Sequence, residues 1–163
     1  MTEYQREQME ALELVTGYLS GLKTADIDLL KEKLADYLHF RKDVDIFLSA
    51  HFSEICTETC YQSQISACCT REGIITFFAD VVINVIMSDE SAIKDLFSAL
   101  HSHQEGSKCV YLGKTGCLWA VKPLICEMFL CKNAEDAVLK NNPDLQKEWQ
   151  ALKDREKTFR WPD

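Results

Sequence analysis

Cysteine is the residue type in this sequence best suited to chemistry, and its positions are unusual. All eight cysteines lie between residues 56 and 131, and the 55 residues before them and the 32 after them contain none. They form two batches, separated by 39 residues without cysteine: Cys56, Cys60, Cys68 and Cys69, then Cys109, Cys117, Cys126 and Cys131. Residues that only fill a core would be spread along the whole chain. The clustering therefore predicts that both batches converge on one soft metal centre.

The thiolate of cysteine is a soft ligand that suits zinc, copper(I) and iron–sulfur clusters. Four thiolates complete a tetrahedral zinc site or hold an iron–sulfur cluster. We therefore treat all eight cysteines as candidate ligands, and we expect the cofactor to be zinc or iron, the latter also in an iron–sulfur cluster. The alternative for any single cysteine is a small buried hydrophobe with an unreactive sulfur.

The spacing of the cysteines ranks the candidates. Side chains of adjacent residues diverge, so only one of Cys68 and Cys69 is expected to bind the ion. The second batch surrounds a predicted hairpin and a helical turn, which constrain its geometry. The expected core ligands are Cys109, Cys117 and Cys126, completed by Cys60 or Cys68 and followed by Cys131. Cys56 and Cys69 are the first expected bystanders.

The composition bounds the class of protein. A chain of 163 residues with 47% hydrophobic and 27% charged residues is predicted to fold as one globular domain. The net charge of −8 argues against a nucleic acid or an anionic membrane as partner. The first residues lack the basic and apolar pattern of a signal peptide, and the longest apolar run, 74–87, is too short and too polar to span a bilayer. We therefore expect a cytoplasmic protein, in which cysteines bind metal or carry redox chemistry more often than they form disulfides.

The hydrophobic pattern predicts mostly helical structure around the cysteines. A hairpin is expected over 108–119, where Gly113 and Gly116 bound a turn. The polar stretch around the first batch is expected to be a loop. The first expected helix covers 3–19, and Met9, Leu12, Val15, Leu19 and Leu22 fall at helical spacing. The β-branched residues of 74–87 favour a strand, but its length and spacing favour a helix. The other expected helices run from a Thr24 cap to 38, over 42–52, over 91–101 after a Ser88 or Asp89 cap, as a turn over 124–130, and from Asn133 and Asn142 caps.

The predicted fold class is therefore mostly α: a single-domain helical fold, residues 1–163, with a small β-hairpin at a cysteine-ligated metal site. The metal-binding region covers 56–131. The helical segments 1–55 and 132–163 flank it and supply core rather than chemistry. No repeat, linker or domain boundary is visible in the sequence.

The pattern of cysteines resembles that of a known family. The segment from Cys109 to Cys131, with Pro123 ahead of Cys126, is similar to the second half of the YkgJ-type cysteine-cluster family, and Cys56, Cys60 and Ala67-Cys68-Cys69 resemble its first half. That family is described as zinc- or iron-chelating domains, so the resemblance implies a metal ion as partner. Here Lys122 stands where the family usually has Arg, and the gap between Cys60 and Cys68 is wider than usual.

Two features leave alternatives open. His51, His101 or His103 could complete a site of three cysteines and one histidine, although surface histidines are more common. The sequence contains no phosphate loop, nucleophile elbow or zinc-protease motif. The leading function is therefore metal binding with a structural, storage or redox role. One alternative is an enzyme or enzyme subunit that uses a zinc or iron–sulfur centre in redox or group-transfer chemistry. Another is a helical interaction module that a metal stabilises.

Overall fold

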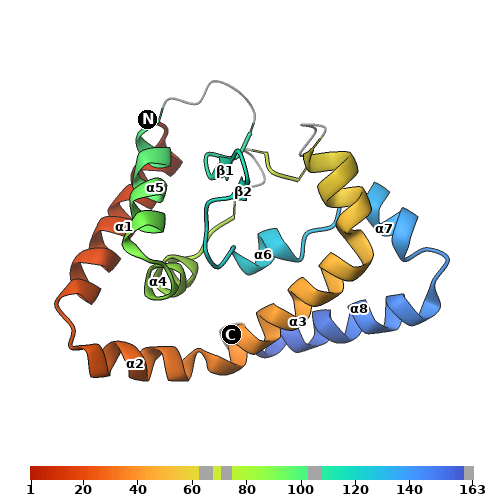
Figure 1. Ribbon diagram of the computed structural model, residues 1–163, viewed down its shortest axis with the longest axis horizontal. Helices are drawn as coiled ribbons and strands as arrows, with labels where there is room; N and C mark the ends of the chain where they lie inside the picture. The colour runs from red at the N-terminus through yellow and green to blue at the C-terminus, as the bar shows by residue number, and fades with distance from the viewer. Residues whose placement is uncertain (63–67, 71–74, 103–107, 160–163) are drawn as a thin grey trace. The chain divides into compact units, whose positions relative to one another are not determined.

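The computed structural model describes residues 1–62, 68–70, 75–102 and 108–159, and these residues are mostly helical (Figure 1). The expected fold class, helices with one small antiparallel hairpin, is confirmed. In chain order the elements are α1 (Glu3–Ser20), α2 (Thr24–Lys33), α3 (Ala35–Phe52), the π-helix η1 (Ser53–Tyr61), α4 (Phe78–Met87), α5 (Glu90–His101), β1 (Leu112–Gly113), β2 (Gly116–Cys117), α6 (Leu124–Glu127), α7 (Lys132–Val138), α8 (Pro143–Glu156) and the 3-10 helix η2 (Lys157–Phe159).

The chain packs as two compact units, each made of two separate segments. Unit 1 contains Met1–Leu34 and Cys69–Glu127, and unit 2 contains Ala35–Cys68 and Met128–Asp163. The chain passes between the units after Leu34, between Cys68 and Cys69, and after Glu127. Because the segments interleave, neither unit is one continuous stretch. This explains why composition and linkers show no boundary in the sequence.

The core of unit 1 is built where α1 packs against α4 and α5. The apolar stripe of α1 predicted from the sequence is buried, and it meets the inner faces of both other helices. The buried helical residues are Met9, Leu12 and Val15 of α1, Val81 and Val85 of α4, and Leu96 and Leu100 of α5. Tyr111 and Trp119 from the hairpin segment join the same cluster, with ring centroids 5.2 Å apart in an edge-to-face arrangement. The core thus holds the hairpin segment as well as the helices.

The core of unit 2 is aromatic. Phe47 of α3 stacks on Trp149 of α8, with ring centroids 5.4 Å apart and planes inclined by 12°. Phe52, Ala134 and Leu139 complete the buried cluster. α3, α7 and α8 are therefore joined by one apolar contact surface, which also supports the end of α3 from which η1 continues.

Several helix ends follow their predicted caps. The carboxylate of Asp89 accepts from the backbone N–H of Ala92 at the start of α5, and Asn142 accepts from Leu145 ahead of α8, whose first residue is Pro143. At α4 the choice of helix over strand is confirmed, but the helix begins at Phe78 rather than at residue 74, which lies outside the described residues.

Four details of the expected secondary structure are wrong. Thr24 is the first residue of α2 and not its cap, because Lys23 occupies that position. The third helix begins at Ala35 instead of residue 42. Cys131, not Asn133, precedes α7 as its cap residue. The stretch around Cys56 and Cys60 is a π-helix and not a loop, since it continues α3 and packs Ile55 and Cys56 against the core of unit 2.

None of the helices in the described part of the chain is both long and apolar enough to cross a membrane.

A buried asparagine ties the segment after the hairpin to the helical core. Asn84 of α4 is 1% exposed, and its side-chain oxygen accepts from the backbone N–H of Val121 at 3.0 Å. We expect Asn84→Ala to destabilise unit 1 by about 1–3 kcal/mol, because the Val121 N–H loses its partner where water has little access. Urea unfolding followed by circular dichroism measures this. The control is Lys94→Ala on the exposed side of α5, expected to change stability by less than about 0.5 kcal/mol. Equal unfolding midpoints for the two variants would contradict the prediction.

Candidate functional site

The structure divides the eight cysteines equally between the two units. All eight lie within the described residues, and none forms a disulfide. Unit 1 holds Cys69, Cys109, Cys117 and Cys126, and unit 2 holds Cys56, Cys60, Cys68 and Cys131. Each unit therefore combines cysteines from both batches. The adjacent pair Cys68-Cys69 is split between the units.

In unit 1 a backbone contact joins the two batches. The N–H of Cys109 donates to the carbonyl of Cys69 at 3.0 Å, and Thr70 and Lys108 form an isolated antiparallel bridge beside it. Residues far apart in sequence are thereby fixed next to each other. Because the bridge is made by main-chain groups, it positions the two cysteines without requiring any particular side-chain contact.

The hairpin then brings the chain back toward Cys109. β1 pairs with β2 in antiparallel register, with Leu112 opposite Cys117 and Gly113 opposite Gly116. Gly116 has a φ of 120°, a conformation that residues with a Cβ rarely adopt. The N–H of Leu112 also donates to the carbonyl of Cys109 at 3.0 Å. The turn and the strand pair together bring Cys117 back toward Cys109.

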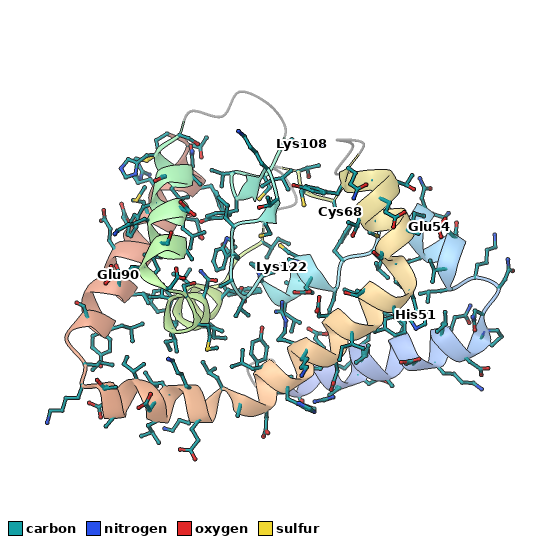
Figure 2. The ribbon with its side chains drawn as sticks, in the orientation of Figure 1. His51, Glu54, Cys68, Glu90, Lys108 and Lys122 are labelled. Atoms are coloured by element: carbon teal, nitrogen blue, oxygen red, sulfur yellow. The ribbon has the colours of Figure 1, made fainter. Side chains whose placement is uncertain are left out.

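The fourth cysteine of unit 1 lies on α6. The sulfur of Cys126 is 3.9 Å from the carbonyl oxygen of Ile75, and Cys126 is the one exposed member of the eight. The ammonium of Lys122 and the carboxylate of Glu127 are 3.9 Å apart across the first turn of this helix. Figure 2 labels Lys108 and Lys122, which precede the hairpin and α6 respectively. The two lysines thus border the stretch that carries two of the four cysteines, Cys109 and Cys117.

Burial and repulsion from neighbouring sulfurs raise the pKa values of two thiols of unit 1, Cys109 and Cys117. Burial raises the pKa of Cys109 to about 12, and the neighbouring Cys117, Cys69 and Cys126 contribute in the same direction. Burial also raises the pKa of Cys117; Lys122 opposes this shift, while Cys69 and Cys126 add to it. The four sulfurs are therefore close enough to influence one another's charge. Their simultaneous ionisation requires a cation that offsets both burial and repulsion.

Two buried phenols lie beside this set. The Tyr111 hydroxyl donates to the side-chain oxygen of Gln8 at 3.2 Å, and the Tyr4 hydroxyl is 3.3 Å from that of Thr76. Burial raises the pKa of both phenols above the ordinary value for tyrosine, with the charge of Cys109 as a smaller contribution. Both phenols therefore stay neutral at neutral pH. No local pattern in the sequence predicts that Tyr4 lies beside the cysteines, because its proximity depends on the packing of α1.

In unit 2, Cys56 and Cys60 lie on η1, Cys131 directly precedes α7, and Cys68 ends its segment of the unit. Cys56 and Cys131 pack against the same aromatic core. Burial raises the pKa of Cys56, and the neighbouring Cys131 and Cys60 raise it further. This group therefore also assembles cysteines from both batches.

The sulfurs are neighbours without forming a closed coordination shell. Across the described residues, no three His, Cys, Asp or Glu side chains are arranged as an ion would require. The case for a metal site therefore rests on how the main chain places the cysteines.

The candidate histidines are placed differently from one another. His51, labelled in Figure 2, lies on α3 in unit 2, and its ring packs on Phe47 with centroids 4.9 Å apart. His101 is exposed, with Nδ1 2.9 Å from the carbonyl oxygen of Phe97. His103 lies outside the described residues. Neither described histidine belongs to the cysteine set of unit 1.

Comparison with known proteins adds no relatives: no family model, no curated protein and no solved structure matches the chain. The resemblance to the YkgJ-type family therefore stays a prediction from its motifs.

The differences in burial predict an order of thiol reactivity in the metal-free protein. At neutral pH, Cys126 should react with iodoacetamide at least about tenfold faster than Cys109 or Cys117, because thiolate content and access both control the rate. Peptide mass spectrometry after timed labelling measures each position. In denaturant the three rates should converge. Labelling of Cys109 as fast as that of Cys126 in the native protein would show that Cys109 is not shielded as described.

Proposed function

We propose that this chain is a cysteine-ligated metal-binding protein that carries zinc or iron, the latter alone or in an iron–sulfur cluster. One observation carries the proposal: main-chain pairing and a hairpin bring Cys69, Cys109 and Cys117, from two separate segments, together in unit 1. Cys69 takes the place that spacing alone assigned to Cys60 or Cys68. The ligand set is then Cys69, Cys109, Cys117 and Cys126.

Metal binding accounts for this arrangement better than packing does. Cysteines kept only as small hydrophobes would be buried in the apolar core, yet Cys126 is exposed. Buried thiols with raised pKa values are also poor nucleophiles, which argues against a reactive cysteine at position 109 or 117. A bound zinc ion or iron centre would displace the thiol protons, and its positive charge would offset the repulsion between the sulfurs.

A complete set of four thiolate ligands also limits the role of the proposed metal centre. A tetrahedral ion held by four protein ligands has no open position for a substrate. The proposed centre is therefore structural, a store of metal, or a carrier of electrons, and no reaction on a bound substrate follows from it. Lys122, whose charge acts on Cys117, would offset part of the negative charge that four thiolates bring to one ion.

Metal analysis of anaerobically purified protein tests the proposal. We expect zinc or iron in the wild type, with visible absorption if an iron–sulfur cluster is present. Cys117→Ser should lose the metal of unit 1, because serine offers a hard and poorly ionised oxygen in place of a soft thiolate. The matched control is Tyr111→Phe, which keeps the core ring and removes only the hydroxyl that bonds to Gln8 and Tyr4. A folded Cys117→Ser protein with the full metal content of the control would refute this ligand set.

Removal of metal should have a local effect in unit 1. The buried stripes of α1, α4 and α5 form a core made by apolar side chains. We expect chelation to increase hydrogen exchange over residues 109–126. Exchange in those three helices should stay nearly unchanged, because apolar side chains and not a metal hold them together. Exchange mass spectrometry before and after chelation measures the difference. Equal loss of protection in α1 and in the hairpin would contradict it.

A further inference from the structure

Unit 2, like unit 1, holds four cysteines drawn from both batches. η1 extends α3 by nine residues as a π-helix, and the N–H of Gln62 donates to the carbonyl of Thr57 at 2.9 Å in the five-residue spacing of that helix. A π-helix takes more residues per turn than the 3.6 of an α-helix, so side chains four or five apart share a face. Cys56 and Cys60 are four apart and therefore lie together on one face of η1.

The third cysteine comes from a distant part of the chain. Cys131 immediately precedes α7, and its carbonyl accepts from the N–H of Glu135 at 3.0 Å. Ala134 of α7 is buried in the same cluster as Phe47 and Phe52 of α3. This packing fixes the start of α7 against the helix that carries η1. Cys131 and Cys56 both rest on that cluster, so their proximity has a cause in the fold.

The unit to which the fourth cysteine belongs follows from the path of the chain between the units. Cys68 is the last residue of its segment in unit 2, and Cys69 is the first residue of its segment in unit 1. Side chains of adjacent residues point in different directions, so Cys68 and Cys69 are not expected to bind the same ion. If Cys69 binds metal in unit 1, Cys68 is left as a candidate ligand for unit 2. The pair that spacing alone treated as one ligand and one bystander can thus supply one ligand to each unit.

We propose that unit 2 holds a second, separate metal centre, formed by Cys56, Cys60, Cys131 and Cys68, so that the chain binds two equivalents of zinc or two iron centres. This inference rests on the proposed function, because it assumes that clustered thiols in this chain bind metal. Zinc or iron is again the expected class, since all four ligands are thiolates. Two of the four come from one helical face, which holds them at a fixed separation before the ion arrives.

The test is metal stoichiometry in protein reconstituted anaerobically with Zn²⁺ alone, read by native mass spectrometry. We expect two ions in the wild type, one in Cys131→Ser, one in Cys117→Ser and none in the double variant. Cys60→Ser, on a different element from Cys131, should also bind one ion. Thr57→Ser on η1 is the matched control and should bind two. Circular dichroism verifies that each variant is folded.

Labelling identifies which centre is lost. In zinc-loaded Cys131→Ser, iodoacetamide should modify Cys56 and Cys60 while Cys109 and Cys117 stay protected. One ion in the wild type that persists in Cys131→Ser and disappears in Cys117→Ser would overturn the second centre and leave the proposed function intact. Loss of all zinc in either single variant would indicate one shared centre and would also overturn it. A folded wild type that binds neither zinc nor iron would overturn both proposals.

Discussion

The main-chain pairing of residues 69–70 with residues 108–109 is the constraint on which the arrangement of unit 1 depends. It consists of the Cys109 N–H bond to the Cys69 carbonyl and the adjacent Thr70–Lys108 bridge. Without it, Cys69 would have no fixed relation to the hairpin. With it, the hairpin needs only two paired residues on each strand to return Cys117 to the same neighbourhood. A sheet this small is marginal alone, and the burial of Tyr111 and Trp119 in the helical core stabilises it.

That anchoring also sets the chemistry of the thiols. Cys109 and Cys117 pack against the core that holds Tyr111 and Trp119, so the contacts that fix the hairpin also remove the sulfurs from water. Burial raises their pKa values, and the proximity of the other sulfurs raises them further. Cys109 and Cys117 are therefore poor nucleophiles as free thiols. Under the proposed function, a metal ion would displace their protons and convert them into soft anionic ligands.

The sequence predicted the parts of this structure that depend on local patterns. The buried stripe of α1, the Asp89 and Asn142 caps and the hairpin all follow from residues within a few positions of one another, and they are confirmed. The π-helix was missed because polar residues dominate its composition, while its stability comes from continuing α3. The grouping of Cys69 with the second batch was out of reach for a similar reason. It depends on a pairing between distant segments, and no spacing along the chain encodes that pairing.

Several cysteines lie close to the points where the chain passes from one unit to the other. The chain leaves unit 2 for unit 1 between Cys68 and Cys69, and it leaves unit 1 again one residue after Cys126, ahead of Cys131. The remaining passage, after Leu34, joins α2 to α3 and has no cysteine near it. At the other two passages a candidate ligand lies on each side, Cys68 and Cys69 at one and Cys126 and Cys131 at the other. Ions bound in the two units would therefore hold the chain on both sides of each of these passages.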